Sequence, residues 1–342
     1  MTTNLILALN CGSSSLKYGV YRATPKDPEL IFESEAEEIT DHSAALAQAL
    51  DHLAQQGLKQ FWKAGHRVVH GGPDIREHQT LTPEVLKKLQ AAIPFAPLHL
   101  PASIAVIEAI QKKMPSLPQI ICLDTAFHRT MPDVARTFAL PLAVRQQGVQ
   151  RYGFHGLSLE SILPQLHPVP PNLVVAHLGN GSSITAIHNS QSIDTTMGLT
   201  PTGGVMMGTR SGELDPGVMV FLARHGFPSA DRLEVLVNDK SGLLGVSGLS
   251  SDVRKLMDAR SQPAPDLALR MFAYQVRKAI ASMAAALGGL NLLVFTGGIG
   301  EHAVPLRQEI CAQLTWMGSF EIRVLPAQED LQIARIALSF SK

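Results

Sequence analysis

Two stretches of this sequence, 168 positions apart, share one design. Residues 5–17 read LILALNCGSSSLK, and residues 173–185 read LVVAHLGNGSSIT. In each, an apolar run typical of a buried strand leads into a tight turn of glycine, serine and asparagine and then into a second strand. An ungapped shift of 168 aligns Leu5 with Leu173 and Leu16 with Ile184. The pattern predicts two copies of one α/β fold, although unrelated hairpins also carry such turns.

A third glycine-rich turn, VFTGGIGE at residues 294–301, follows another apolar run and precedes a helical pattern. Glycine lets the main chain approach a phosphate closely, so backbone N–H groups in such turns can bind phosphate oxygens. None of the three turns is a P-loop, because GxxxxGK[ST] is absent, and GGIGE is not a dinucleotide fingerprint. Each turn alone is typical of an ordinary structural connection, but three at strand ends favour a phosphate site.

The composition is that of an ordinary globular protein with a small-molecule partner. The chain has 342 residues, 45% of them hydrophobic, which is enough for two domains with sizeable cores. Lys+Arg and Asp+Glu both number 29, so no charge excess indicates nucleic acid or an anionic membrane. Cys11, Cys122 and Cys311 are widely spaced and fit small hydrophobes in a reducing compartment. With no long apolar run and no evident signal segment, we expect a soluble cytoplasmic protein.

Apolar runs bounded by glycine, aspartate or asparagine alternate with helical patterns, which is the α/β signature. Strands are expected at Leu5–Leu9, Leu16–Tyr21, Gly65–Val69, Gln119–Leu123, Leu173–Leu178, Ile184–His188 and Leu292–Phe295. Helices are expected at Pro83–Ala92, Ala102–Met114, Asp266–Leu287, Val304–Met317 and Glu329–Leu338. The segment 24–58 is polar and irregular, and its elements are not assigned.

Charged side chains lie beside the turns. Arg67 lies in HRVVHGG, in an expected strand that runs into a Gly-Gly turn, and Arg210 lies in VMMGTRSGELDPG. A guanidinium presents a planar fork that matches carboxylate and phosphate oxygens, so two arginines can hold a carboxylate and a phosphoryl group together. Each could equally be an ion-paired surface arginine. Asp124 follows a buried run, where α/β proteins place functional acids, or else caps the next turn. His155 taken alone is typical of a structural histidine.

Nine motifs follow one another in a distinctive order. They are LALNCGSSSLK, HRVVHGG, PLH, LDTAFH, RYGFHG, HLGNGSS, MGLTPTGGVMMGTRSGELDPG, SGLLGVSGLSSDVRK and FTGGIGE. In them the chain resembles the acetokinase family, the acetate kinases with their propionate and butyrate kinase relatives, over about Leu5 to Arg335. The resemblance implies α/β architecture with two duplicated ribonuclease H-like, actin-like ATPase domains and a nucleotide cleft between them. The expected domains are residues 1–128 with 330–342, and residues 129–329.

The resemblance also implies a role for each matching residue. The catalytic residues would be Arg67, Asp124, His155 and Arg210. The acyl chain would contact Val69, Leu98, Phe154 and Pro201. The nucleotide would be bound by Lys17, His177, Asn180, Gly181, Asp252, Arg254, Gly297, Gly298, Ile299 and Gly300. The metal would be held near Asn10 and Glu329. On this interpretation Arg210 sits on a mobile, glycine-rich loop that brings it to the substrate.

The chain also departs from the family pattern. Pro73 and Leu100 replace a glutamate and an asparagine that commonly follow HRVVHGG and PLH, and we expect both near the arginine site. His302 replaces an asparagine after GGIGE, where the nucleoside would bind. Leu157 and Leu159 replace a threonine and a histidine after RYGFHG. The resemblance therefore constrains the chemistry more closely than the acid or the phosphoryl donor.

The activity implied is reversible transfer of the γ-phosphoryl group of ATP to acetate or propionate, with Mg²⁺ or Mn²⁺, in a homodimer. A carboxylate is already ionised at neutral pH, so no general base is needed and catalysis comes from positioning and charge neutralisation. Three alternatives stay open at this point. One is an acyl kinase that uses pyrophosphate or GTP, and another is a non-enzymatic Hsp70-like ATPase or binding protein. The third, a homologue that has lost its catalytic activity, is disfavoured because the set of charged residues is complete.

Overall fold

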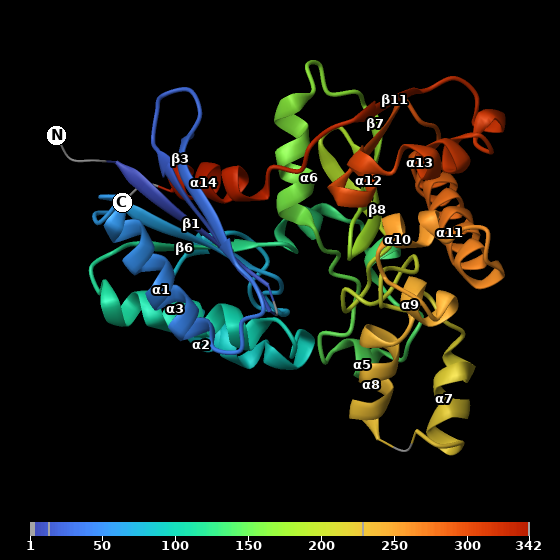
Figure 1. Cartoon of the computed structure of the whole chain (residues 1–342), viewed down its shortest axis with the longest axis horizontal. Helices are drawn as coiled ribbons and strands as arrows, with labels where there is room; N and C mark the ends of the chain where they lie inside the picture. Colours follow the sequence, from blue (N-terminus) through green and yellow to red (C-terminus); the bar gives the residue numbers. More distant parts are fainter. Residues whose placement is uncertain (1–3, 13, 228, 341–342) are drawn as a thin grey trace. The chain divides into compact units, whose positions relative to one another are not determined.

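The computed structural model describes residues 4–12, 14–227 and 229–340, which form two compact units (Figure 1). The first unit comprises Met1–Arg129, His155–Ser161 and Gln328–Lys342, and the second comprises Thr130–Phe154 and Ile162–Ala327. The segment 155–161 thus groups with the first unit, whereas the expected boundaries assign it to the second half of the chain. The physical reason is that Leu157 is fully buried in a core of the first unit.

The first unit is built on a six-stranded sheet in the order β3-β2-β1-β4-β6-β5. Its strands are β1 (Leu5–Cys11), β2 (Leu16–Arg22), β3 (Glu29–Ala36), β4 (Lys63–Val68), β5 (Gln79–Thr80) and β6 (Gln119–Leu123). Strands β1, β2 and β3 pair antiparallel, whereas β1, β4 and β6 run parallel. The carboxyl ends of three parallel strands therefore meet at one edge of the sheet, where α/β proteins place their ligands.

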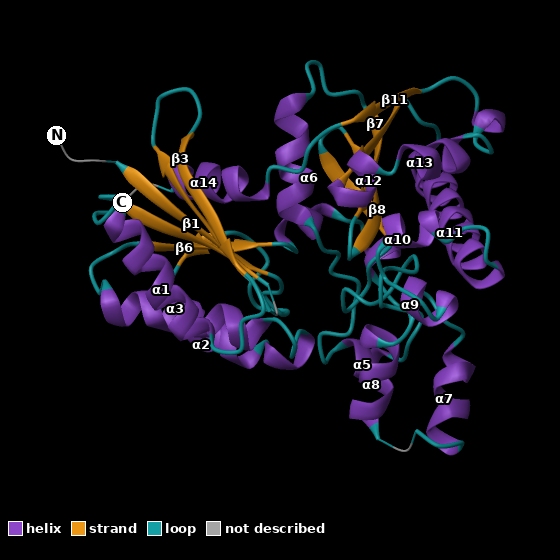
Figure 2. Cartoon of the chain, viewed as in Figure 1, coloured by secondary structure: helices purple, strands orange, loops and turns teal. Residues whose placement is uncertain are grey.

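Helices cover both faces of this sheet (Figure 2). On one face lie α1 (His42–Gln55), α2 (Pro83–Ala91) and α3 (Leu100–Lys113), and on the other lie α14 (Glu329–Ser339) and the start of α6 (Gly156–Ile162). Leu7 and Leu9 of β1 point toward α1 and α3, and Ile6 and Ala8 point toward α14. This strict alternation is what a strand buried on both faces requires. It fixes which β1 side chains reach each layer.

The second unit contains a five-stranded sheet in the order β11-β10-β7-β8-β9. Its strands are β7 (Asn172–Leu178), β8 (Ser182–His188), β9 (Gln191–Thr195), β10 (Leu292–Thr296) and β11 (Glu321–Val324). One face packs against α9 (Gly242–Ser247), α10 (Val253–Asp258), α11 (Pro263–Leu287) and α13 (Val304–Cys311). The remaining helices are α4 (Asp133–Arg136), α5 (Leu142–Arg145), α7 (Pro216–Arg224), α8 (Ala230–Asp239) and α12 (Gly297–His302).

The two sheets repeat one topology, as the sequence predicts. The order β3-β2-β1-β4-β6 matches β9-β8-β7-β10-β11, with the same antiparallel and parallel pairings. The ungapped shift of 168, however, is wrong by one residue. Leu7 and Leu9 face the helices between strands, and so do Val174 and Ala176, which requires a shift of 167. A one-residue error would turn every side chain of the strand to the opposite face.

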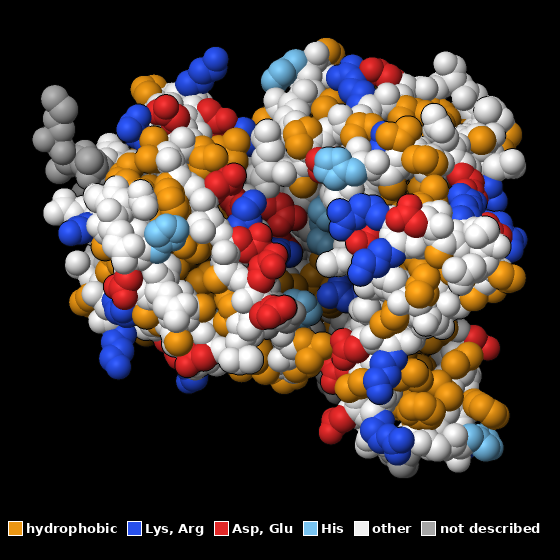
Figure 3. Space-filling model, viewed as in Figure 1, with side chains coloured by type: hydrophobic (Ala, Val, Ile, Leu, Met, Phe, Trp, Pro, Cys, Tyr) orange, Lys and Arg blue, Asp and Glu red, His pale blue; other side chains and the backbone are white. Residues whose placement is uncertain are grey.

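Two helices of the second unit lie outside its core. Neither α7 nor α8 buries a side chain. Figure 3 shows exposed hydrophobic side chains gathered over them, among them Val218, Val220, Phe221 and Val235. These helices therefore do not help to hold the strand ends in place.

Most of the expected elements are confirmed, with small shifts at their ends. The expected helix Val304–Met317 is shorter, because α13 ends at Cys311 and a separate 3₁₀ turn covers Thr315–Met317. The unassigned segment 24–58 contains β3 and α1, and α1 buries Ala45, Leu46, Ala49 and Leu53. Among the described residues, no helix is long and apolar enough to cross a membrane.

Candidate active site

Arg67 and Asp124 form the centre of the polar site in the first unit. Arg67 is the penultimate residue of β4, and Asp124 directly follows β6, the parallel strand beside it. The Arg67 guanidinium binds Asp124 in a bidentate manner, with Nη2 2.7 Å from Oδ2 and Nε 3.2 Å from Oδ1. Asp124 is 1% exposed, and the Arg67 side chain is 19% exposed. The structure thus brings together two of the predicted catalytic residues.

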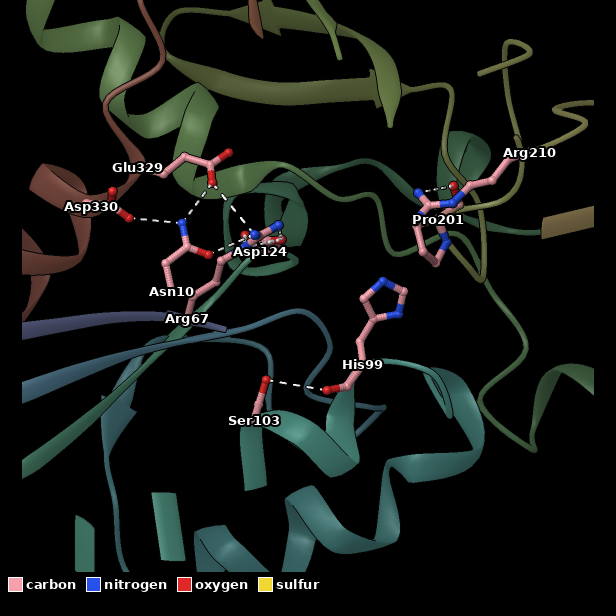
Figure 4. A network of polar contacts seen from close by, with 9 residues as sticks. All are labelled: Asn10, Arg67, His99, Ser103, Asp124, Pro201, Arg210, Glu329 and Asp330. Atoms are coloured by element: carbon pink, nitrogen blue, oxygen red, sulfur yellow. Dashed lines mark hydrogen bonds and ion pairs between the residues drawn. The ribbon is translucent and has the colours of Figure 1, made fainter. Parts of the chain in front are cut away.

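A network of polar side chains continues from Arg67 to the start of α14 (Figure 4). Arg67 Nη1 donates to Asn10 Oδ1 at 2.9 Å and lies 3.7 Å from Glu329 Oε2. Asn10 Nδ2 donates to Asp330 Oδ1 at 2.9 Å and to Glu329 Oε2 at 3.5 Å. Because α14 packs on the face of the sheet that Ile6 and Ala8 cover, its first turn reaches the end of β1. Residues 319 or 320 positions apart therefore share one site.

The charges of this network are unevenly matched. The carboxylates of Asp124, Glu329 and Asp330 face the cations of Arg67 and Lys17, whose Nζ lies 2.7 Å from Asp330 Oδ2. One negative charge is therefore in excess. Burial alone would lower the pKa of Arg67, but Asp124 and Glu329 raise it above its ordinary value. Burial raises the pKa of Asp124, and the guanidinium opposes that rise, so we take the pair as ionised at neutral pH.

The donor set fits a hard divalent cation, because such ions take oxygen ligands and the network has excess negative charge. Glu329 offers a carboxylate that is 17% exposed. Asn10 has its amide oxygen on Arg67 and its amide nitrogen on Glu329 and Asp330, so here it orients the acids. Across the described ranges, no three His, Cys, Asp or Glu side chains are grouped to hold a metal. A cation at this position would need further oxygen ligands from substrate or water.

His155 lies directly before α6, and the residue after it contacts the backbone of Asp124. Its φ is +61°, a conformation that non-glycine residues adopt rarely and that recurs at functional sites. The next residue, Gly156, donates its N–H to Asp124 O at 2.8 Å. A Cβ at Gly156 would lie 2.3 Å from that oxygen, so only glycine permits this approach. The turn therefore holds His155, which is 9% exposed, next to the strand end that carries Asp124.

Two of the predicted nucleotide-binding segments meet at the carboxyl ends of β7 and β10 in the second unit. These strands are parallel, with Thr296 opposite His177. Gly297 has φ +77°, and a Cβ there would lie 2.7 Å from Leu178 O and 3.2 Å from His177 Nε2. The turn 297–300 and the turn after His177 thus share one edge of the sheet. The Gly297 N–H, however, donates to Glu301 Oε1 at 3.0 Å.

The loop 250–252 belongs to the same cluster through Gly208. The Gly208 N–H donates to Asn180 O at 3.3 Å, and a Cβ at Gly208 would be 3.4 Å from Ser251 Cβ. Asp252 caps α10 by accepting the Arg254 N–H, and it also pairs with the Arg254 guanidinium at 2.8 Å. The Arg254 side chain is 89% exposed. Asn180 and Ser251 therefore both lie beside Gly208, and a nucleotide site formed by Asn180, Gly181, Asp252 and Arg254 stays a prediction.

The loop that carries Arg210 is joined to its surroundings by main-chain hydrogen bonds, and its mobility stays a prediction. Met207 N–H donates to Arg210 O, and Ser211 N–H donates to Val237 O. Gly242 is there because a Cβ would lie 2.2 Å from Met207 O. The glycines permit close packing of backbone on backbone. Arg210 Nη1 donates to Pro201 O at 3.3 Å, which joins two predicted site residues of the second unit.

The four predicted acyl-pocket residues are divided between the units. Val69 and Leu98 belong to the first unit, where Val69 is buried and Leu98 is 47% exposed. Phe154 and Pro201 belong to the second unit, where Phe154 is buried and Pro201 is half-buried. A common pocket formed by all four stays a prediction.

The residues that depart from the family pattern have separate explanations. Leu100 is fully buried in a core that includes Val68 and Leu123, the chain neighbours of Arg67 and Asp124. Pro73 is exposed. Leu157 and Leu159 are both fully buried, and Leu157 packs against Ile333 of α14, so hydrophobic side chains suit these positions. His302 ends α12 and is exposed.

Three functional side chains were missed from sequence. Asp330 links Asn10 to Lys17, and Glu301 accepts the N–H groups of Gly297 and Ala327. Glu160 of α6 pairs with His78. Asp330 could have been suggested because it adjoins Glu329 in the first turn of an expected helix. Nothing in the sequence pairs Glu160 with His78, which precedes it by 82 positions.

Comparison with known proteins agrees with this arrangement. The family model described as Acetokinase family matches residues 31–330. The chain is 43% identical to an acetate kinase of Rhodopseudomonas palustris, over 92% of this chain and 87% of that protein. Its fold resembles crystal structures of the acetate kinase of Porphyromonas gingivalis and a propionate kinase of Francisella tularensis, both with a TM-score of 0.89 and with 34% and 32% identity. These alignments cover 98% and 99% of this chain, and 99% and 100% of those chains. The predicted fold class is confirmed, and the chain belongs to the acetokinase family.

Proposed function

We propose that this chain is a short-chain carboxylate kinase that transfers the γ-phosphoryl group of ATP reversibly to acetate or propionate. Membership of the acetokinase family supports a kinase, and the names of its relatives support acetate or propionate as the acceptor. The single observation that carries the proposal is the buried Arg67–Asp124 pair beside Glu329, at the ends of three parallel strands. A fixed cation at such an edge suits an anionic reactant.

The proposed chemistry depends on charge and position. The carboxylate acceptor is ionised at neutral pH, so none of the residues needs to remove a proton from it. Asp124 and Asn10 hold the Arg67 guanidinium through Nε, Nη1 and Nη2, which prevents it from rotating away. A charge fixed in this way stabilises developing negative charge without reorganisation during the reaction. We assign Arg67, His155 and Arg210 to the phosphoryl and carboxylate groups, with Asp124 as the residue that fixes Arg67.

A divalent cation, Mg²⁺ or Mn²⁺, is part of this proposal. When bound, the cation would neutralise negative charge on the phosphate oxygens. Glu329 would hold it, and Asn10 would orient that carboxylate through Nδ2. Lys17 Nζ pairs with Asp330 at 2.7 Å, and Glu329 Oε2 lies 3.7 Å from Arg67 Nη1.

The nucleotide would lie at the second unit's cluster of His177, Asn180, Gly181 and the segment 297–300. Gly298 has open space where a Cβ would project, so its backbone is accessible to a ligand. We also assign the loop of Asp252 and Arg254, and the side chain of Ile299, to nucleotide binding. We also propose a cytoplasmic homodimer, as the family resemblance implies. Neither alternative, a different phosphoryl donor or an Hsp70-like binding protein, gains support from the comparisons.

A matrix of donors and acceptors tests the function. Purified protein with Mg²⁺ is given ATP, GTP or pyrophosphate together with acetate, propionate or butyrate, and hydroxylamine traps any acyl phosphate as a hydroxamate. We expect ATP with acetate or propionate to give the fastest turnover. Faster turnover with pyrophosphate than with ATP would show that the donor is pyrophosphate. If no pair of donor and acid yields a hydroxamate, the proposed function is rejected. Light scattering of the same sample tests the homodimer.

A further inference from the structure

The carboxylate of Glu160 links α6, α14 and, through His78, the end of β6. Each of these elements begins or ends at, or next to, a proposed site residue. Glu160 lies in the second turn of α6, the helix that His155 precedes. His78 Nε2 lies 3.1 and 3.2 Å from the two Glu160 oxygens. Gln332 Nε2 of α14 donates to Glu160 Oε2 at 3.3 Å. Because α14 begins at Glu329, Gln332 lies one turn along the helix from that residue.

The tautomer of His78 is fixed by its second partner. His78 Nδ1 accepts the N–H of Leu123 at 3.0 Å, so Nδ1 carries no proton. The proton of the neutral ring is then on Nε2, which donates it to Glu160. Leu123 is the last residue of β6, directly before Asp124. His78 therefore links the strand end that carries Asp124 to the helix that follows His155.

Two backbone contacts reinforce the same junction. Ser161, next to Glu160, accepts the N–H of Gln328 through Oγ at 3.0 Å, immediately before Glu329. Gly156 donates to the carbonyl of Asp124 at 2.8 Å. The side chains of His78 and Glu160 are each 16% exposed, so this pair is better protected from water than an ordinary surface ion pair.

We propose that His78 and Glu160 act as one positioning unit that sets where His155, Asp124 and Glu329 lie relative to one another. Neither side chain is assigned to substrate, nucleotide or metal. They would act through the three elements that they join, and displacement of a reacting group by about 1 Å can cost about 10²-fold in rate. This inference rests on the proposed function, because it concerns how that reaction is supported.

The test compares Glu160 with a matched control in the same unit. Gln90 Nε2 donates to Glu108 Oε1 at 3.0 Å, so a glutamine and a glutamate join α2 to α3 with similar chemistry but far in the chain from any site residue. Glu160→Leu, His78→Leu, the double variant and Glu108→Leu are assayed for hydroxamate formation with ATP and acetate, and their thermal unfolding is followed by circular dichroism.

We expect Glu160→Leu to lower kcat about 10-fold to 100-fold with both KM values changed less than about 2-fold, while Glu108→Leu stays within about 2-fold of wild type. The double variant should be no slower than the slower single variant, because two parts of one unit are not additive. Glu160→Gln, which keeps the hydrogen-bonding shape, should restore at least half of the wild-type kcat.

Three results would overturn the inference: a Glu160→Leu enzyme as fast as the Glu108→Leu enzyme, additive losses in the double variant, or a Glu160→Gln enzyme as slow as Glu160→Leu. If Glu160→Leu does not fold, Glu160→Asp decides the matter, because it keeps the charge but shortens the reach. A folded Glu160→Asp enzyme with unchanged kcat would contradict the inference. Wild-type enzyme that forms no hydroxamate would instead reject the proposed function.

Discussion

The Arg67 guanidinium lies with Nη2 2.7 Å and Nε 3.0 Å from the same oxygen of Asp124, and Asp124 is almost completely buried. An ion pair in this setting is strongly coupled, because either charge alone would be left in a medium that solvates it poorly. The pair therefore supports the fold at the same position where we assign catalysis.

Asp124→Asn should lower both stability and activity. It leaves the Arg67 cation facing a neutral amide, and breaking one side of a buried pair costs about 3–5 kcal/mol. Urea denaturation monitored by tryptophan fluorescence measures the loss. The double variant Arg67→Met/Asp124→Leu should regain stability but not activity. A single variant as stable as wild type would contradict the coupled arrangement.

Arg210→Ala should reduce kcat by about 10²–10³-fold, which is typical of removing a fixed group that stabilises developing charge. Arg210→Lys should restore little of it, because an ammonium lacks the planar fork. Steady-state kinetics with acetate and ATP provide the measurement. An alanine variant that keeps more than half of the wild-type turnover would remove Arg210 from the site.

Glu329→Gln should raise the Mg²⁺ concentration needed for half-maximal activity, since a neutral amide replaces the carboxylate that we assign to the cation. Titration of Mg²⁺ at fixed nucleotide tests this. Lys17→Met should have the opposite effect or none, because it removes a cation paired with Asp330. An unchanged Mg²⁺ requirement in Glu329→Gln would place the metal elsewhere.

His66 should make the protein sensitive to acid. Burial lowers the pKa of His66 from 6.5 to about 4, so between these values the unfolded chain binds a proton that the folded chain does not. Stability contributed by neutral His66 is present above pH 6.5 and is lost as the pH falls toward 4, by up to about 1.4 kcal/mol per pH unit. His66→Gln should flatten this part of the pH profile in denaturant unfolding. Parallel profiles for the two proteins would show that His66 does not contribute.

Val69→Ala should shift the enzyme toward longer acids. Val69 is 5% exposed, and its truncation makes room for about one additional methylene, which is worth up to about 0.8 kcal/mol. We expect acetate or propionate to be preferred by wild type, with selectivity among C2 to C4 acids of about 10-fold to 200-fold. The ratio of kcat/KM for butyrate and acetate measures the shift. If butyrate is already the best substrate of wild type, or the ratio does not move, the pocket is formed by other residues.

The sequence predicted the strands well because buried parallel strands produce long apolar runs that few other elements share. It placed Asp124 at the carboxyl end of a strand for the same reason, and it placed Arg67 within the strand Gly65–Val69. No single ungapped shift fits both strands, because the β1–β2 turn is one residue longer than the β7–β8 turn. β1 matches β7 at a shift of 167, and β2 matches β8 at a shift of 166. Sequence identity alone cannot detect such a difference in turn length.

Other features depended on packing that local patterns do not encode. The polar segment 24–58 contains α1, which was not predicted. Its alanines are interspersed with polar residues and give only a weak hydrophobic periodicity. Glu160 and His78 meet only because α6 and the residues before β5 pack near the end of β6. The glycines around Arg210 permit close contacts between backbone segments. Composition alone does not reveal such contacts.

Isotope transfer tests the central claim most directly. Purified protein is incubated with Mg-ATP and acetate labelled with ¹⁸O in both carboxylate oxygens, and the product is examined by ³¹P nuclear magnetic resonance. Direct attack of the carboxylate on the γ-phosphorus, with ADP as the leaving group, predicts acetyl phosphate with ¹⁸O at the oxygen that bridges the acyl carbon and the phosphorus, which shifts its phosphorus resonance. Release of unlabelled inorganic phosphate, with no acetyl phosphate formed at any time, would contradict the account.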